Sequence, residues 1–314
     1  MLARRAHRIG LALASFTAGA IIGGLAQLHV GVCWTFNADR AAAHADTCSQ
    51  KCDVTPKLVS PSDPAAQWTG AMTITCVAVQ LVLAAVLVLG EVSGRLRLPY
   101  SKFGTGVGVN SRTGLALAYT TPIIIYIAFW IEGGAPQSPY HLIVLAAFLL
   151  HFIRRILEIL FVNSYSRPTP LRALVPIALL YGGVAASSAF FQVHSSGQPP
   201  SSPTFMLGTV VFGLGELLNG YHHWLLARLR PSGVRTYVMP RGGLFGWVAS
   251  PHYFGEILSF VGYAMMSDLL PVWGNALVVS AYLSSRANSN LKWYQREMPL
   301  RIPSGWRRLV PFAY

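Results

Sequence analysis

Runs of about twenty apolar residues recur along this chain, and they constrain its fold more than any other feature. A helix of about twenty residues crosses the hydrocarbon core of a bilayer, and the chain is 53% hydrophobic but only 11% charged. We expect spans at residues 10–30, 69–90, 114–131, 140–162, 173–193, 204–226, 244–267 and 270–285. The sequence therefore predicts an all-α polytopic membrane protein, a bundle of about seven to eight transmembrane helices.

The chain divides into four segments by composition: a first apolar helix (1–30), a loop that contains cysteines (31–68), N-terminal membrane helices (69–139) and a polar-rich membrane region (140–314). The first helix reads as a signal anchor or an extra transmembrane helix, and cleavage as a signal peptide is the alternative. Cys33, Cys48 and Cys52 lie in the loop, where an oxidising lumen permits a disulfide among them. These cysteines lack a second closely spaced pair, so no metal site is predicted.

The formal net charge of +13 is compatible with nucleic-acid binding, but the positions of the cations argue against it. Nineteen of the 24 lie in alternate loops or tails: Arg4, Arg5, Arg8, Arg95, Arg97, Lys102, Arg112, Arg167, Arg172, Arg228, Arg230, Arg235, Arg241, Arg286, Lys292, Arg296, Arg301, Arg307 and Arg308. The opposite loops carry only Arg40, Lys51 and Lys57. This asymmetry follows the positive-inside rule, so we expect both termini in the cytosol and no nucleic-acid partner.

Polar side chains follow helical spacing in the span at 140–162: His151, Arg154, Arg155 and Glu158. One interpretation is a salt bridge from Glu158 to Arg154 or Arg155 that only fixes helix packing. The other is that two adjacent arginines exceed what one glutamate neutralises, which leaves positive charge for a phosphate-bearing ligand.

The span at 204–226 repeats this pattern with Glu216, Asn219 and His223, and Arg230 follows in the next loop. A polar stripe that runs into a basic loop predicts a binding cleft open to the cytosol. For His223, placement at the membrane interface beside Trp224 is the alternative.

The last two segments also carry polar faces. In the first of them helical spacing joins His252, Glu256, Ser259 and Tyr263, after a Ser250-Pro251 helix start whose free backbone N–H groups suit an anion. In the second, one face carries Arg286, Asn290 and Tyr294, which alone would also fit a solvated helix beyond the membrane. No dinucleotide-binding glycine motif follows a strand, so any cofactor must bind among the helices.

At these residues the region 140–314 resembles the steroid 5α-reductase family, which includes very-long-chain trans-2-enoyl-CoA reductases and polyprenol reductases. Four blocks carry the resemblance: residues 151–162, Asn219 with residues 229–231, residues 240–256, and Arg286 through Tyr294 to residues 310–312. The resemblance implies reduction of a lipid carbon–carbon double bond with NADPH, in a helical bundle of the endoplasmic reticulum membrane whose cofactor site opens to the cytosol.

The resemblance also implies residue roles. It places NADPH against Asn219, Arg230, His252, Glu256, Arg286, Asn290 and Tyr294, to which the polar stripe adds His223. Tyr253 and Arg154 match a tyrosine and a lysine of enoyl-CoA reductases, so we expect Tyr253 to donate the proton, with Arg154 or His151 as electrostatic support. Where steroid-type members carry a Gln-Glu pair and a tyrosine, this chain has Ala118-Tyr119 and Phe152. We therefore expect Tyr119, Phe152 and Glu158 to contact the substrate.

These departures leave the substrate open. The leading hypothesis is an NADPH-dependent reductase of a double bond conjugated to a carbonyl in a lipid, with an enoyl thioester favoured over a 3-oxo-4-ene steroid or a polyprenol. An isoprenylcysteine-type membrane methyltransferase and an inactive lipid-binding homologue are the alternatives. The expected partners are a lipid from the bilayer or an acyl-CoA, membrane lipids and other lipid-elongation enzymes.

Overall fold

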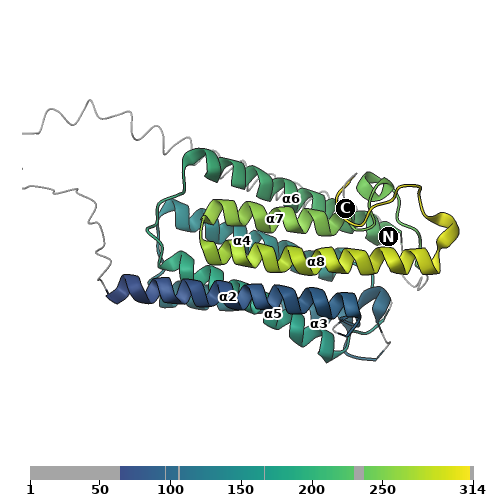
Figure 1. The fold of residues 1–314 in the computed structure, drawn as a ribbon, viewed down its shortest axis with the longest axis horizontal. Coiled ribbons are helices and arrows are strands. Elements are labelled where there is room, and N and C mark those ends of the chain that lie inside the picture. Colours follow the sequence, from purple (N-terminus) through teal and green to yellow (C-terminus); the bar gives the residue numbers. More distant parts are fainter. Residues whose placement is uncertain (1–63, 96, 105–106, 166, 230–236, 312–314) are drawn as a thin grey trace, which may run out of the picture.

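The computed structural model describes residues 64–95, 97–104, 107–165, 167–229 and 237–311. Within them the chain forms seven α-helices and no β-strand: α2 (Pro64–Ser93), α3 (Ser111–Glu132), α4 (Pro139–Leu157), α5 (Leu171–Val193), α6 (Ser202–Arg228), α7 (Pro251–Ser267) and α8 (Leu270–Glu297) (Figure 1). Short helical turns are η2 (Ser101–Phe103), η3 (Glu158–Val162), η4 (Gly243–Gly246) and η5 (Pro299–Arg301). The prediction of an all-α membrane protein is confirmed.

Three of the described helices are long and apolar enough to cross a membrane on composition alone, over Gly70–Ser93, Ser111–Glu132 and Leu171–Val193. They match three predicted spans. The predicted first helix and residues 31–63 of the cysteine loop lie outside the described residues, so the total number of spans stays a prediction; residues 64–68 of the predicted loop belong to α2.

Two helix ends differ from the predicted spans. The predicted span at 244–267 begins with η4 and a short loop, and α7 starts only at Pro251, where proline suits the first helical turn. The predicted span at 270–285 instead continues to Glu297 as one helix, because its polar residues Arg286 and Asn290 are buried against other helices rather than solvated.

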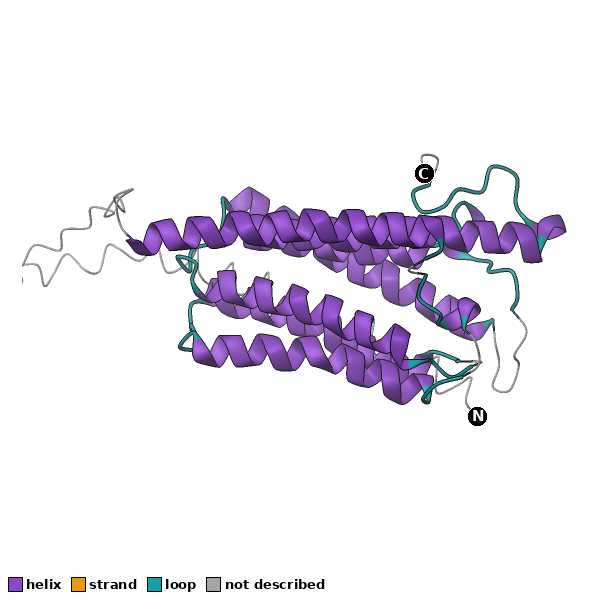
Figure 2. Cartoon of the chain, turned by 60° about the horizontal axis from the view of Figure 1, so that its bottom comes forward, coloured by secondary structure: helices purple, strands orange, loops and turns teal. Residues whose placement is uncertain are grey.

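The helices lie side by side, with the connecting loops gathered at the two ends of the bundle (Figure 2). One end holds the described parts of the connections that follow α2, η3 and α6, and the described segment after α8. Most lysines and arginines of the described residues lie in these segments or in the adjoining helical turns, and Arg286 lies further inside, on α8. We call this the basic end.

Helix α6 packs along α7, α3 along α5, and α2 along α8. Between α6 and α7 the backbones approach so closely that only glycine fits. A methyl group on Gly215 would clash with the backbone nitrogen of Ser259, and one on Gly255 with the backbone nitrogen of Asn219. Small residues bring membrane helices together in this way, and here they place the polar side chains of α6 and α7 in one layer.

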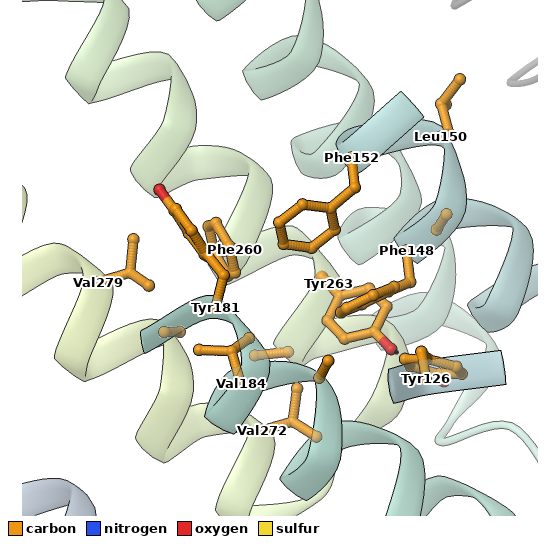
Figure 3. Close-up of a cluster of buried hydrophobic side chains, with 14 of the residues drawn as sticks. Tyr126, Phe148, Leu150, Phe152, Tyr181, Val184, Phe260, Tyr263, Val272 and Val279 are labelled. Carbon is orange, nitrogen blue, oxygen red and sulfur yellow. Dashed lines mark hydrogen bonds between the residues drawn. The ribbon is translucent and has the colours of Figure 1, made fainter. Parts of the chain in front are cut away.

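The interior of the bundle contains a cluster of aromatic side chains that includes Tyr126, Phe148, Phe152 and Tyr263 (Figure 3). Large apolar side chains also cover the outside, and Ile74 on α2 is 72% exposed. An apolar exterior around an interior with buried charges suits a protein whose solvent is lipid.

Candidate active site

A cavity of about 800 Å³ opens between the helices at the basic end, within the roughly 300–1,000 Å³ typical of ligand sites. Its apolar lining includes Leu83, Leu87, Leu115, Ile177, Leu180 and Leu283. Seven cations line it as well: Arg95, Arg97, Lys102, Arg155, Arg167, Arg172 and Arg286. Among the described lining residues, Glu256 is the one carboxylate. The cavity therefore suits a ligand with both anionic and apolar parts.

The structure brings together many of the predicted site residues, although they come from α3, α6, α7 and α8. Eight of them line the cavity: Tyr119, His223, His252, Tyr253, Glu256, Arg286, Asn290 and Tyr294. Five others are buried behind its wall: His151, Phe152, Arg154, Glu158 and Asn219. Arg230 lies outside the described residues.

Arg154 is the centre of a buried ionic network. Its Nε donates to Oε2 of Glu216 at 2.5 Å, its Nη2 donates to Oδ1 of Asn219 at 2.8 Å, and its Nη1 donates to Glu158. Nδ1 of His151 lies 2.7 Å from the other oxygen of Glu216. Two arginines on α4 thus meet two glutamates. Glu216 of α6 balances the surplus positive charge inferred from α4 alone, so the two arginines and two glutamates together carry no net charge.

Arg155, the second arginine of α4, reaches the cavity wall. Its Nη1 donates to Glu158 and lies 2.6 Å from Nδ1 of His223, which is itself 2.8 Å from Oε2 of Glu158. The guanidinium lies over the ring of Tyr119 at 5.2 Å. Its buried Nε has no hydrogen-bond partner within the described structure. Of the two arginines, Arg155 is therefore the one with a donor to offer a ligand.

Asn219 connects the network to the wall formed by α7. Its Nδ2 donates to the carbonyl oxygen of His252 at 2.7 Å and lies 3.4 Å from Oε2 of Glu256. The close glycine contact between α6 and α7 makes these short distances possible. Nδ1 of His252 is buried and has no partner among the described residues. Since an unpaired buried nitrogen costs free energy, this atom is a candidate ligand contact.

Arg286 on α8 is buried but lines the cavity. Its Nη1 lies 3.3 Å from Oε2 of Glu91 at the end of α2, and its Nη2 donates to the carbonyl oxygen of Leu98 at 3.1 Å. The rings of Tyr100 and Phe103 lie 4.6 and 4.4 Å from the guanidinium carbon. The loop after α2 thus holds this arginine in place, and Glu91 is a partner that sequence reasoning missed.

Comparison with known proteins now identifies the family. The family model for 3-oxo-5-alpha-steroid 4-dehydrogenase matches residues 172–314. A 3-oxo-5-alpha-steroid 4-dehydrogenase 1 of Macaca fascicularis is 30% identical over 57% of this chain and 68% of the relative. The chain belongs to the steroid 5α-reductase family.

Other members of the steroid 5α-reductase family are similar over comparable lengths. The Bos taurus 3-oxo-5-alpha-steroid 4-dehydrogenase 1 is 29% identical over 68% of this chain and 85% of its own length. A very-long-chain enoyl-CoA reductase of Dictyostelium discoideum is 30% identical over 62% of this chain and 67% of its own length. The resemblance drawn from the sequence is confirmed. Both kinds of reductase match, so the relatives support a reductase and leave its substrate open.

The cavity of this family member fits a nicotinamide dinucleotide by the chemistry of its donors. Arginine side chains suit phosphate groups, and two cavity arginines, Arg155 and Arg286, each keep a buried Nε without a partner in the described chain. Nδ1 of His252 and the carboxylate of Glu256 add groups that can pair with an amide or a hydroxyl.

Several cavity residues were not among the predicted site residues. Arg95, Arg97, Lys102, Arg167 and Arg172 line its mouth, and their positions along the sequence indicated only membrane orientation. Lys102 also lies 3.9 Å from the centre of the Tyr294 ring. The loop cations therefore line the cavity, in addition to indicating the orientation of the helices in the membrane.

Two tyrosines at the mouth remain neutral donors. Burial raises the pKa of Tyr165 to about 12, although the hydrogen bond with Asn163 partly offsets this. Burial likewise raises the pKa of Tyr100, and the neighbouring Arg286 cation partly offsets that rise. At neutral pH neither phenol adds negative charge to a cation-lined site.

Proposed function

We propose that this protein is an NADPH-dependent reductase of a carbon–carbon double bond conjugated to a carbonyl in a lipid. One observation carries the proposal: a member of the steroid 5α-reductase family has a single cavity that combines a cation-lined mouth with an apolar interior. A phosphate-rich cofactor and a lipid need these two environments next to each other.

The cofactor would be held at the basic end. Arg155 and Arg286 would face its phosphates, and His252, Glu256 and Asn290 would pair with amide and hydroxyl groups. When bound, NADPH supplies the hydride for the double bond. Arg230, Asn219, His223 and Tyr294 stay predicted cofactor residues, with Asn219 acting from behind the wall through His252.

Tyr253 is our proposed proton donor. It lies on the first turn of α7, lines the cavity, and is near Asn290 and Arg286. Its phenol would donate a proton to the α-carbon of the substrate as the reduced product forms. Arg154 and His151 do not reach the cavity, so we assign them to the support of its wall: they hold Glu216 and Asn219.

A long-chain trans-2-enoyl-CoA is the favoured substrate. The exposed Arg95, Arg167 and Arg172 at the mouth would suit the phosphates of an acyl-CoA. The apolar interior also reaches Leu83 and Leu179, which are 37% and 70% exposed on the outside of the bundle. A lipid chain in the bilayer would therefore find an apolar path to the cavity. We place the protein in the endoplasmic reticulum membrane, with its basic end and C-terminus in the cytosol.

The test is NADPH consumption by detergent-purified protein, with mass analysis of the product. A long-chain trans-2-enoyl-CoA and a 3-oxo-4-ene steroid are offered in parallel, and a polyprenol in a third reaction. We expect reduction of the thioester and its loss in Tyr253→Phe. Reduction of the steroid alone would overturn the substrate preference. Binding of S-adenosylmethionine without binding of NADPH would contradict the proposal that the protein is a reductase.

A further inference from the structure

Three polar side chains form a line in the cavity, and one of them, Tyr181, has no role so far. The hydroxyl of Tyr181, on α5, donates to Oε1 of Glu256 at 2.7 Å. The hydroxyl of Tyr119, on α3, lies 3.5 Å from that of Tyr181. All three side chains line the cavity and are buried. They come from three different helices, so the bundle itself brings them together.

The ring of Tyr181 is fixed by aromatic neighbours. Its centre lies 5.0 Å from that of Tyr119 and 5.4 Å from that of Phe152, and the ring stacks on Phe260. In Figure 3 its hydroxyl points away from the aromatic cluster. The ring of Tyr181 thus packs on Phe152, while its hydroxyl lies on the side away from it.

The two hydroxyls are spaced to share one oxygen. At a separation of 3.5 Å, both can lie at the roughly 2.7–2.8 Å typical of an O–H···O bond from an oxygen between them. A phenol has one proton and can also accept. Rotation about each C–O bond, with the ring unmoved, would direct the hydroxyl proton to that oxygen. Glu256 would then keep its contact with Asn219.

A cation near the two hydroxyls favours an oxygen that becomes negatively charged, and it offsets the opposing effect of the Glu256 carboxylate. The Arg155 guanidinium lies over the ring of Tyr119 at 5.2 Å. Donors already in place in a site shielded from water stabilise a developing oxyanion strongly. Glu256 holds the Tyr181 hydroxyl oxygen in position while the site is empty. Binding of the ligand would therefore require the O–H to turn from Glu256 to the ligand oxygen, with no movement of the ring.

We propose that Tyr119 and Tyr181 together bind the carbonyl oxygen of the unsaturated lipid. This inference rests on the proposed function and names a residue, Tyr181, that it did not include. Hydride addition brings two electrons and a hydrogen to the β-carbon, and the electron pair of the double bond moves so that negative charge forms on the carbonyl oxygen. The two tyrosines stabilise that charge by hydrogen bonds and keep their protons. The proton that completes the reaction reaches the α-carbon from Tyr253, which is reprotonated from water.

The chain offers a matched control for these substitutions. Tyr126 and Tyr263 form a second buried hydroxyl pair, 3.3 Å apart, that does not line the cavity (Figure 3). Tyr126→Phe therefore removes the same chemical group from the same kind of environment. Thermal unfolding of each purified variant checks that the fold is retained.

The kinetic test compares Tyr181→Phe, Tyr119→Phe and Tyr126→Phe. For each of the first two we expect kcat to fall by about 100-fold, the scale for loss of one oxyanion donor. NADPH affinity should stay within about twofold, and Tyr126→Phe should behave as wild type. Wild-type kcat in Tyr181→Phe would overturn the inference and leave the proposed function intact. If wild-type protein reduces no probe, the proposed function fails and the inference fails with it.

A second measurement does not depend on turnover. Wild-type protein saturated with NADP⁺ has no hydride to transfer, so a trans-2-enoyl-CoA or a 3-oxo-4-ene steroid stays intact in the cavity. Infrared difference spectra of a probe labelled with carbon-13 at the carbonyl report the hydrogen bonds to that oxygen. We expect the stretching band at lower frequency on wild type and Tyr126→Phe than on Tyr181→Phe and Tyr119→Phe. One frequency on all four proteins would overturn the inference.

Discussion

Nη1 of Arg286 lies 3.3 Å from Oε2 of Glu91, so an arginine on the cavity wall already has a buried anionic partner. Glu91 is 1% exposed and lies near the end of α2, while Arg286 is on α8. A phosphate placed beside Arg286 would therefore share its cation with Glu91. The pair couples the strength of anion binding to the packing of α2 on α8.

Glu91→Gln should separate the effect of this pair on anion binding from its effect on the packing of α2 against α8. Loss of the anion leaves Arg286 buried and uncompensated, so we expect the ligand-free protein to lose several kcal/mol of stability, on the scale of about 3–5 kcal/mol for a broken buried pair. NADPH should then raise the unfolding temperature by more than it does in wild type. Glu297→Gln, which removes an exposed pair with Arg296, should change neither value. Equal stabilisation of wild type and Glu91→Gln by NADPH would contradict the coupling.

Arg286→Ala should weaken NADPH binding more than NADH binding. If the guanidinium faces the extra phosphate, its loss should cost NADPH about tenfold in Kd, or about 1.4 kcal/mol, relative to NADH. Competitive binding of both dinucleotides to the purified protein measures the ratio. The exposed Arg296→Ala, on the same helix, is the control. An equal loss for the two cofactors would place the extra phosphate elsewhere.

Glu216→Gln should destabilise the protein strongly. Arg154 would keep one carboxylate, Glu158, which it shares with Arg155, and a buried positive charge would remain unpaired. We expect a loss of about 3–5 kcal/mol. The double variant Arg154→Met with Glu216→Leu should lose less stability than Arg154→Met and Glu216→Leu lose in sum as single variants, because it removes both charges together. Additive losses in thermal unfolding would show that the two side chains do not act as a pair.

Gly255→Ala should disturb the contact between α6 and α7. The added methyl group would clash with the backbone of Asn219, and overpacking of this kind costs about 1–3 kcal/mol. Because Asn219 also bonds to His252, cofactor affinity should fall with stability. Gly246→Ala is the matched control, since nothing lies within 4 Å of the position its methyl would take. An unfolding temperature equal to that of wild type would mean that the helices separate at no cost.

Hydrophobic runs predicted the fold class, and helical spacing together with the family resemblance predicted eight residues that line the cavity, because these signals are local. Partners across helices are not local. Nothing within α4 shows that Glu216 neutralises Arg154, and nothing within the apolar α5 sets Tyr181 apart from a packing residue. Glu91 is similar: a single carboxylate at the end of an apolar run looks like a helix boundary until α8 brings Arg286 to it.

Helix ends were missed for a related reason. Hydropathy ends the last predicted span at 285, where polar residues begin, but the helix continues to Glu297, and Arg286, Asn290 and Tyr294 on it line the cavity. Polarity along a sequence does not distinguish water outside the protein from a polar cavity inside it. The loop cations could not be assigned from the sequence for the same reason. Accumulation of Lys and Arg in alternate loops is expected both from membrane orientation and from ligand binding.

The helices divide into two groups by how they would enter a membrane during synthesis. In the described chain, α2, α3 and α5 are apolar enough to insert on their own, whereas α4 and α6 carry the opposite charges of the buried network. An isolated α4 would insert less readily, because Arg154 and Arg155 in its last turn add a cost that reaches about 2.5–3.5 kcal/mol per arginine at the centre of a span. We therefore expect α4 to be retained beside the translocon until α6 supplies Glu216. A substitution that breaks the network would then lower the yield of inserted protein before it could lower activity.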